Sequence, residues 1–325
     1  MPKEIVIASV GTSAIMSLMQ QAVAAVPGVT CQVAYSRDEE RGRAFAQSAG
    51  VPEHSADYSA VLERPDIDAV YIASPNRFHL EQALQAMERG KHVILEKPAA
   101  VRKGDAERLI QAAQEHEVFF FEAISTLFMP NYLALRELLP QLGRVSGAEI
   151  RYGQYSSKYD AYLRGENPNI FNPEMEAGAL NDMGVYCVHA AADLFGPPET
   201  VEYQGEYGPN GVDLAGRLLL GYRDFTCQVE TAKDRNLDSG CLIRGEGGWL
   251  RSSGPLNEFP AAQACLNGET RDIQRQQGLK NRLVFELSRF RDAIWDRDRD
   301  FFQRMARQSA LTASILEAAH AGAKK

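Results

Sequence analysis

The first third of the chain alternates short apolar runs with segments in which apolar residues recur every three or four positions. The apolar runs predict strands at residues 4–10, 30–35, 69–73, 92–96 and 118–121. The periodic segments predict helices at residues 14–26, 38–49, 80–89 and 102–117. Repeated alternation of strand and helix is typical of a parallel, doubly wound sheet with helices on both faces. We therefore predict an α/β domain over residues 1–122.

After residue 122 the pattern changes to strands that follow one another through tight turns. A helix is predicted at residues 130–139, and strands at residues 145–155, 200–207, 211–222, 225–231 and 239–244. Such a series favours a mixed or antiparallel sheet that is open on one face. Two further helices are predicted at residues 279–294 and 301–321. We expect residues 123–325 to form an α+β domain for substrate binding and oligomerisation, with C-terminal helices that could pack back on the first domain.

Composition narrows the class of partner. The 325 residues carry a formal charge of −8 and no long basic run, which argues against a nucleic-acid surface and favours a small-molecule substrate. The chain has no apolar run long enough to span a membrane, and its start does not resemble a signal peptide. Its five cysteines are widely spaced, so we expect reduced thiols and a cytoplasmic protein. Its six histidines show no metal-ligand spacing, so we expect no metal.

The turn after the first strand could bind phosphate. Gly11 takes the first position of the dinucleotide fingerprint, but Ser13 and Met16 stand where the second and third glycines would be. The turn still lies between a strand and a helix, where backbone N–H groups bind phosphate oxygens. We therefore expect a Rossmann cofactor site that uses Gly11, Thr12, Ser13, Ala14 and Ile15.

The end of the second strand bears on which dinucleotide is used. An acid usually stands here in proteins that select NAD, whereas an Arg accommodates the 2′-phosphate of NADP. Ser36 and Arg37 therefore favour NADP, although Asp38 could reach a ribose and keeps NAD open. A purely structural alternative is a capping box, with Ser36 as the N-cap, Glu39 three residues later and Arg37 in solvent.

Two groups of polar residues could carry chemistry. The strand at 92–96 runs into Glu96, Lys97 and Pro98, and a cation at the carboxyl end of a parallel strand would overhang bound ligand and polarise an oxygen. Asp182, Tyr186 and His189 recur at helical spacing on one face. Hydride transfer to a carbonyl needs a cation on the oxygen and an acid that delivers a proton. The structural alternatives are a solvated Glu–Lys pair and a buried polar cluster.

The order of these motifs resembles the glucose-fructose oxidoreductase / inositol dehydrogenase / rhizopine catabolism (Gfo/Idh/MocA) family along nearly the whole chain. The resemblance rests on residues 11–13, 35–37, 74–76 with His79, 90–93, 96–98, 122–123, and 178–180 followed by Asp182, Gly184 and Tyr186. It departs from the family where residues 127–130 lack an Arg and where Ala177 replaces a glycine.

The resemblance implies a catalytic set of Lys97, Asp182 and Tyr186. It makes His189 a substrate contact, for which Tyr159 and Asn172 are further candidates. The remaining expected cofactor contacts are Ser74, Pro75, Asn76, His79, Glu96 and Lys97.

Together these features predict an NADP-dependent oxidoreductase, with NAD possible, that acts on a hydroxyl or carbonyl of a sugar, polyol or related cyclic alcohol. Two alternatives remain. One is a non-catalytic dinucleotide sensor, and the other is an NAD-dependent glycosidase or eliminase without net redox change. We expect a homodimer or homotetramer that associates through the outer face of the second sheet, with Leu218, Leu220 and Tyr222 contributing to that face.

Overall fold

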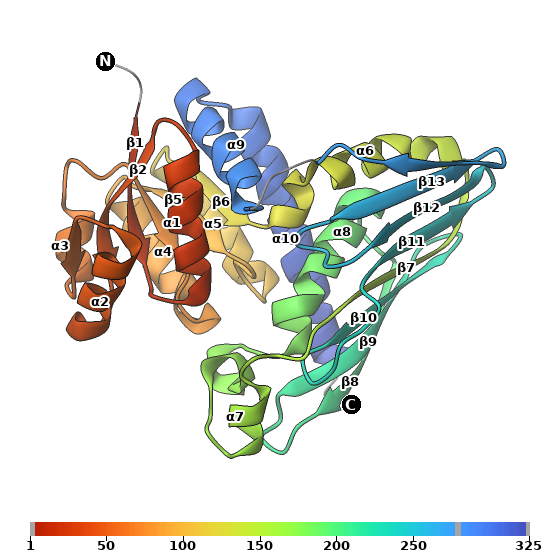
Figure 1. Cartoon of the computed structure of the whole chain (residues 1–325), viewed down its shortest axis with the longest axis horizontal. Helices are drawn as coiled ribbons and strands as arrows, with labels where there is room; N and C mark the ends of the chain where they lie inside the picture. The colour runs from red at the N-terminus through yellow and green to blue at the C-terminus, as the bar shows by residue number, and fades with distance from the viewer. Residues whose placement is uncertain (1–3, 277–280, 323–325) are drawn as a thin grey trace. The chain divides into compact units, whose positions relative to one another are not determined.

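The computed structural model describes residues 4–276 and 281–322 (Figure 1). The described chain divides into two compact units. The first contains residues 4–100, 104–123 and 281–310, and the second contains residues 101–103, 124–276 and 311–322. The last helix, α10 (Arg299–Gly322), therefore contributes residues to both units.

The first unit is a parallel sheet with strands in the order β3-β2-β1-β4-β5-β6. The strands are β1 (Ile5–Val10), β2 (Val29–Tyr35), β3 (Glu53–Ser55), β4 (Ala69–Ile72), β5 (His92–Glu96) and β6 (Phe120–Ala123). Every residue of β4 and β6 is buried, as expected for parallel strands covered on both faces. This strand order has its reversal between β1 and β4, and it confirms the predicted doubly wound α/β fold.

Helices of the first unit connect these strands. They are α1 (Ala14–Ala25), α2 (Glu39–Ala49), α3 (Tyr58–Leu62), α4 (His79–Glu88) and α5 (Lys103–Glu115), followed much later by α9 (Leu283–Asp296). The aromatic side chains of the C-terminal helices pack against β6: the rings of Phe121 and Phe290 stack with their centroids 4.8 Å apart, and Phe301 lies at 5.4 Å from Phe121. The predicted start of α9 at Leu279 lies outside the described residues.

The second unit contains an eight-stranded sheet in the order β14-β13-β12-β11-β7-β10-β9-β8. Its strands are β7 (Val145–Gly153), β8 (Thr200–Tyr207), β9 (Asp213–Gly221), β10 (Thr226–Ala232), β11 (Gly240–Gly245), β12 (Gly248–Ser253), β13 (Ala261–Leu266) and β14 (Glu269–Ile273). Neighbouring strands run antiparallel except for the β7–β10 pair, which is parallel. The predicted mixed sheet is therefore confirmed, but β12, β13 and β14 were not predicted.

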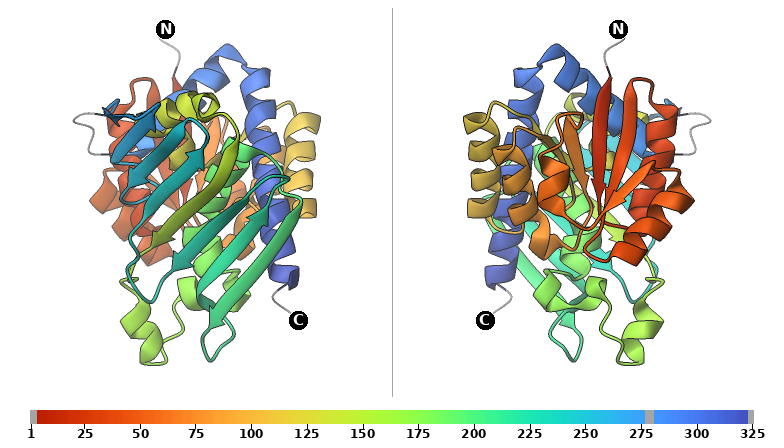
Figure 2. Two further views of the ribbon diagram at one scale, coloured as in Figure 1. Left: turned by 90° about the vertical axis from the view of Figure 1, so that its right-hand side faces the viewer. Right: turned by 90° about the vertical axis from the view of Figure 1, so that its left-hand side faces the viewer.

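Helices cover one face of this sheet. They include α6 (Pro130–Leu138) and α8 (Val185–Phe195), which is preceded by a π-helical turn at Leu180–Gly184; the short α7 (Tyr159–Leu163) lies in the connection after β7. Along β7, Ala148, Ile150 and Tyr152 are buried while the residues between them are partly exposed. The left view of Figure 2 looks onto the opposite face of the sheet, where most of the strand surface faces the viewer directly.

One expectation about the outer face is wrong. Leu218 and Leu220 are 1% and 0% exposed in the single chain, so they point toward the face that the helices cover. Because successive strand residues alternate between faces, Arg217 and Leu219 are the outward residues of β9. Tyr222 lies just after β9, and its ring stacks on Phe225 at 4.8 Å. Association through the outer face stays a prediction that rests on other residues.

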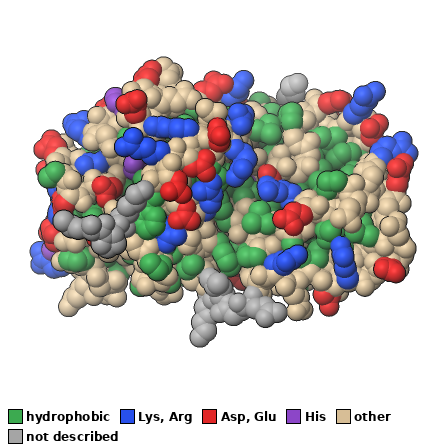
Figure 3. All heavy atoms as spheres, turned by 90° about the horizontal axis from the view of Figure 1, so that it is seen from above, with side chains coloured by type: hydrophobic (Ala, Val, Ile, Leu, Met, Phe, Trp, Pro, Cys, Tyr) green, Lys and Arg blue, Asp and Glu red, His purple; other side chains and the backbone are tan. Residues whose placement is uncertain are grey.

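The surface mixes both signs of charge. On the face seen in Figure 3, acidic and basic side chains are intermingled rather than gathered by sign. Among residues 4–276 and 281–322, no helix has both the length and the apolar character needed to cross a membrane.

Candidate active site

Gly11 allows the chain to turn tightly between β1 and α1. Its φ is +110°, and a Cβ at this position would lie 2.9 Å from the carbonyl oxygen of Ala73. Ser13 is the N-cap of α1, but its side chain makes no capping hydrogen bond, and Met16 is fully buried beneath the turn. The first N–H groups of a helix have no partners within the helix, so this turn presents donors to an anion.

The segment after β2 departs from the expected capping box. The N-cap of α2 is Asp38, whose Oδ1 accepts a hydrogen bond from Arg41 N at 3.0 Å. Ser36 is instead bonded to the backbone N–H of Asp38, at 3.3 Å. The capping box centred on Ser36 is therefore wrong, while a contact between Asp38 and a ribose stays a prediction. Arg37 is exposed, and its guanidinium lies 4.3 Å from the ring centre of Phe78.

His79 joins the loops that follow β4 and β5. Its Nδ1 lies 2.9 Å from the carbonyl oxygen of Pro98, and its Nε2 lies 2.8 Å from that of Ser74. Burial lowers the pKa of His79, which favours a neutral ring. A neutral imidazole has one N–H, so it donates to only one of these carbonyl groups at a time. Ser74, Pro75 and Asn76 are all partly exposed at this strand end.

Glu96 and Lys97 point in opposite directions, as consecutive residues at a strand end do. Glu96 is buried, and its Oε1 accepts a hydrogen bond from the hydroxyl of Tyr71 at 2.6 Å. Burial raises the pKa of the Glu96 carboxyl. Lys97 is half-buried at the carboxyl end of β5, followed by a cis peptide bond to Pro98. The structure therefore places Lys97 where the sequence predicted a cation, on the edge of the sheet where Gly11 and His79 also lie.

Asp182 forms an ion pair that the sequence analysis missed. In the second unit, Lys233 Nζ lies 2.9 Å from Asp182 Oδ2 and also donates to the carbonyl oxygen of Ile170. The Lys233 ammonium lies 4.6 Å from the ring centre of Phe171, and the residue is only 1% exposed. A buried ammonium needs partners, and these three groups supply them. Lys233 thus fixes the carboxylate of Asp182 relative to the end of β10.

Tyr186 and His189 follow Asp182 on α8. The ring of Tyr186 packs edge-on against Tyr152 of β7, with centroids 5.5 Å apart, and the residue is 7% exposed. His189 is fully buried, and its Nδ1 lies 3.1 Å from the hydroxyl oxygen of Thr312 on α10. A contact between His189 and a substrate would require this ring to be uncovered, and that role stays a prediction.

The two other expected substrate contacts lie in the connection between β7 and the π-helical turn. Tyr159 is half-buried, and its ring lies 5.6 Å from that of Phe171 and 5.4 Å from that of Tyr155. Asn172 is buried, and its Oδ1 accepts a hydrogen bond from Glu174 N at 2.9 Å. Phe171 therefore lies between Tyr159 and the ammonium of Lys233, within one cluster of the second unit.

A sequence signal for Lys233 did exist. Residues 226–232 form a strand in which buried and more exposed residues alternate up to Thr231, and Lys233 is the first charged residue after it. A charged residue directly after a strand was noted for Lys97 but not for Lys233, because the second sheet was not expected to bring its strand ends together at one site.

Comparison with known proteins places these features in a family. A family model described as an oxidoreductase family with an NAD-binding Rossmann fold, GFO_IDH_MocA, matches residues 5–123. A model for the GFO/IDH/MocA C-terminal domain matches residues 132–251. The two models together match more than half of the chain.

Relatives and solved structures agree with this assignment. The chain is 37% identical to the scyllo-inositol 2-dehydrogenase (NADP(+)) IolU of Bacillus subtilis over 75% of this chain and 74% of that protein. It is 38% identical to the uncharacterized oxidoreductase YgjR of Escherichia coli over 66% of each chain. In fold it is similar to KijD10, a 3-ketoreductase from Actinomadura kijaniata, with a TM-score of 0.85, 22% identity and 98% coverage of both chains.

The family explains the features of the first unit. A dinucleotide fits the turn at Gly11, where a Cβ would collide with Ala73 and where helix N–H groups are available. Both halves of the chain match the family in order, and the relatives that match them are named dehydrogenases and oxidoreductases. The chain therefore belongs to the Gfo/Idh/MocA family of NAD(P)-binding oxidoreductases.

Proposed function

We propose that this protein is an NADP-preferring dehydrogenase or reductase whose substrate is a sugar, polyol or related cyclic alcohol. The observation that carries the proposal is the ion pair between Asp182 and the buried Lys233, one helical turn before Tyr186. A sensor that only binds a dinucleotide has no need to hold a carboxylate in this way. The names of the relatives support the substrate class, because IolU is called an inositol dehydrogenase that uses NADP.

In this proposal each catalytic residue has one task. The bound nicotinamide supplies or accepts the hydride. Lys97 donates a hydrogen bond to the substrate oxygen and so stabilises the charge that develops there. Tyr186 holds the proton at its hydroxyl oxygen and delivers it in the reducing direction. Asp182 accepts a hydrogen bond from a neighbouring substrate hydroxyl and so orients the reacting carbon.

The cofactor assignment uses residues of the first unit. Residues 11–15 hold the pyrophosphate through backbone N–H groups, and Ser36 and Arg37 take the 2′-phosphate. Ser74, Pro75, Asn76 and Lys97 lie at neighbouring strand ends on the same sheet edge and complete the site. His79 and Glu96 are both buried. Their hydrogen bonds to the loops after β4 and β5 and to Tyr71 stabilise that edge of the sheet.

Substrate contacts are assigned to the second unit. The exposed part of the Tyr159 ring offers an apolar face to the C–H groups of a sugar or cyclic alcohol. Asn172 offers an amide to its hydroxyl groups. Lys97 and Tyr186 belong to different units, so their action on one substrate is the part of the proposal that variants must test.

The test is a turnover screen. Purified protein is incubated with NADP⁺ or NAD⁺, or with their reduced forms, and with a panel of inositols, aldoses, alditols and dicarbonyls, and reduced cofactor is followed by absorbance. We expect turnover with at least one cyclic polyol or sugar and a higher kcat/KM with NADP(H). Cofactor binding without turnover across the panel would overturn the proposal in favour of a sensor. Conversion of a glycoside without net change in cofactor would overturn it in favour of transient redox chemistry.

A further inference from the structure

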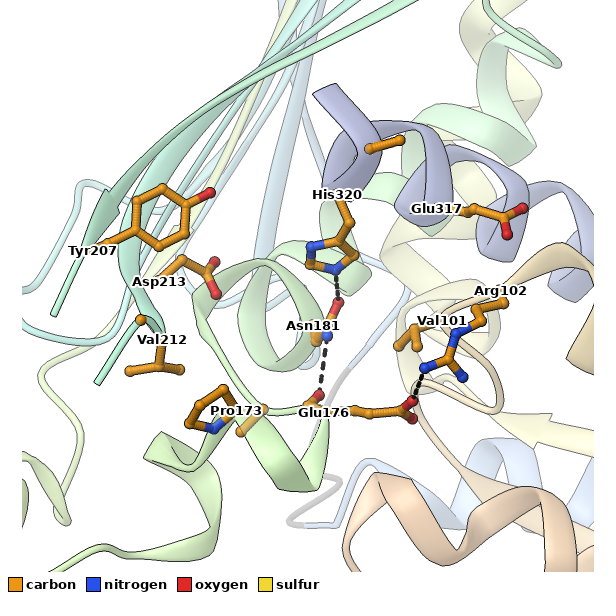
Figure 4. A pocket seen from close by; sticks show the side chains of 13 residues that line it. Val101, Arg102, Pro173, Glu176, Asn181, Tyr207, Val212, Asp213, Glu317 and His320 are labelled. Atoms are coloured by element: carbon orange, nitrogen blue, oxygen red, sulfur yellow. Dashed lines mark hydrogen bonds and ion pairs between the residues drawn. The ribbon is translucent and has the colours of Figure 1, made fainter. Parts of the chain in front are cut away.

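A cavity of about 610 Å³ lies in the second unit, apart from the proposed catalytic residues (Figure 4). Its volume falls within the range of small-molecule sites. Its walls are formed by Val101, Arg102, Pro173, Glu176, Ala177, Asn181, Tyr207, Gly211, Val212, Asp213, Glu317, His320 and Ala321. All of these residues belong to the second unit, and neither Asp182, Tyr186 nor Lys233 is among them.

Asp213 offers an unused acceptor to this cavity. The residue is only 5% exposed, and its Oδ2 accepts hydrogen bonds from Leu180 N at 2.8 Å and from the Tyr203 hydroxyl at 2.7 Å. Its Oδ1 has no hydrogen bond from any residue that the structure describes, and Figure 4 shows the carboxylate directed into the cavity. A carboxylate oxygen that faces a cavity without a protein donor can accept a charge-assisted hydrogen bond, so an N–H donor of a ligand would be stabilised there.

The basic side chains of the wall already have partners within the protein. Arg102 pairs with Glu176 at 2.7 Å, and His320 Nε2 lies 2.8 Å from Asn181 Oδ1, while Asn181 donates to the carbonyl oxygen of Glu176. Figure 4 shows these contacts as one chain of interactions along the wall. The exposed Glu317 accepts a hydrogen bond from the backbone N–H of Lys103 at 3.3 Å, whereas the two printed partners of the Asp213 carboxylate, Leu180 N–H and the Tyr203 hydroxyl, are both uncharged. The cavity therefore favours a ligand that brings positive charge and hydrogen-bond donors.

Two glycines shape the cavity around Asp213 and Tyr207. Gly178 has a φ of +128°, and a side chain there would overlap Asp213 Oδ1. A Cβ on Gly205 would lie 2.7 Å from the Tyr207 ring, so this glycine lets the ring fold across its strand. Tyr207 is 49% exposed, and an exposed aromatic ring beside carboxylates attracts a cation. Val101, Pro173 and Val212 supply apolar walls for a carbon skeleton.

A metal ion does not account for these charges. Within the described residues, no group of three or more His, Cys, Asp or Glu side chains is placed to hold a metal. We propose that this cavity binds a small organic cation, with a primary ammonium bonded to Asp213 Oδ1 and with its carbon skeleton against Tyr207 and Val212.

The cavity also borders the turn that carries the proposed catalytic carboxylate. Asn181 lines the cavity and directly precedes Asp182 in the π-helical turn, and Asp213 binds the N–H of Leu180 in the same turn. A ligand in the cavity could therefore shift the backbone next to Asp182. Its binding does not depend on the proposed reaction.

The experiment compares three probes of similar length and different charge. Putrescine, butanediol and succinate are titrated into the full chain by isothermal titration calorimetry at neutral pH and low ionic strength. We expect putrescine to bind at least about tenfold more tightly than butanediol, and succinate not to bind, because charge-assisted hydrogen bonds are the stronger ones. Equal binding of putrescine and butanediol, or preferential binding of succinate, would overturn the proposal.

Variants locate the binding. Asp213→Asn should weaken putrescine binding about tenfold, and Tyr207→Leu should weaken it about threefold. Glu269→Gln removes an exposed carboxylate of the same unit outside the cavity and should leave the affinity unchanged. Tyr207 is exposed, so its variant tests the site even if Asp213→Asn does not fold. Parent-like affinity in Tyr207→Leu would show that the amine binds elsewhere and would refute the proposal.

Discussion

The two units of this protein hold their proposed functional residues in different ways. In the first unit the site consists mainly of backbone, with a glycine turn, a helix N-terminus and strand ends along one edge of a parallel sheet. In the second unit it consists of side chains that hold one another, because Lys233 after β10 fixes Asp182 on a π-helical turn. A backbone site depends on local sequence, whereas a side-chain site depends on how distant strands align.

The comparison predicts where each unit is vulnerable. A backbone site tolerates changes of most side chains around it and loses function only through the few groups that touch substrate. A side-chain site also loses function when a supporting residue is removed. The following variants test this difference, from the largest expected effect to the smallest.

Lys97→Met should lower kcat by about 1000-fold, because it removes the one side-chain charge that the first unit contributes to the substrate oxygen. Because Lys97 is also a proposed cofactor contact, cofactor affinity, measured by quenching of protein fluorescence, should fall, but far less than kcat. The exposed Lys103→Met is the matched control and should keep full turnover. Substantial activity in Lys97→Met would mean that the first unit contributes only the cofactor.

Tyr186→Phe should lower kcat by about 100-fold or more, the scale of general acid catalysis, and leave cofactor binding intact. The ring keeps its packing against Tyr152, so thermal stability should not change. If Tyr186→Phe kept the parent rate and His189→Ala lost it, the acid would be His189 and our interpretation of α8 would be wrong.

Lys233→Met should lower kcat/KM by about 30-fold, because a misplaced catalytic group, here the carboxylate of Asp182, can lower the reaction rate by up to about 100-fold. It should also lower the free energy of unfolding by about 2 kcal/mol, less than for a fully buried pair because the Asp182 side chain is 32% exposed. The double variant Lys233→Met with Asp182→Asn should regain stability in urea denaturation but not activity. Recovery of both would reduce Lys233 to a structural role without influence on Asp182.

Arg37→Ala should raise the KM for NADPH about tenfold more than the KM for NADH, because a guanidinium binds the 2′-phosphate bidentately. Arg37→Lys keeps the charge but loses the stacking on Phe78, and should show an intermediate preference. An equal rise for both cofactors in Arg37→Ala would show that Arg37 contacts a part that NADP and NAD share.

Glu286→Gln should raise stability, and more so at higher pH. In the first unit, both carboxyl oxygens of Glu286 are buried without a hydrogen-bond partner, and burial with the nearby charge of Glu96 raises the pKa of this carboxyl well above its ordinary value of 4.5. The folded state therefore retains a proton that the unfolded state releases, so stability falls as pH rises from 4.5 toward the folded-state pKa.

The measurement for Glu286 is the Tm across pH. Glu286→Gln should match the parent near about pH 4 and exceed it by about 2–4 °C near about pH 8. The exposed Glu40→Gln on α2 is the control and should show no pH-dependent gain. A parent-like profile for Glu286→Gln would mean that this carboxyl is ionised in the folded protein.

The sequence predicted five of the six strands of the first unit because these five are mainly apolar, and it missed the short polar strand β3. It placed Gly11, Lys97 and His79 at strand ends that the parallel order brings to one edge. It missed β12–β14, where glycines and polar residues interrupt the alternation, as in residues 248–253. It also assigned Leu218 and Leu220 to the wrong face, because alternation shows that two faces differ without showing which one the helices cover.

The pairing of Asp182 with Lys233 could not be predicted from either residue alone. The two are about 50 positions apart, and their contact depends on the parallel pairing of β7 with β10, which brings the end of β10 beneath the π-helical turn. The N-cap of α2 is a second feature that the local sequence does not determine. Ser36 and Asp38 both suit an N-cap, and only the backbone path after β2 decides between them.

The division of the chain between the units affects how it can fold during synthesis. Residues 281–310 belong to the first unit, although they leave the ribosome about 160 residues after β6. At about 5–20 residues per second, the ribosome needs roughly 8–30 seconds to supply them. During that interval Phe121 lacks its packing partners Phe290 and Phe301, and an apolar strand at the edge of the nascent sheet stays uncovered. The nascent protein is therefore expected to need a chaperone most between the completion of β6 and the release of α9.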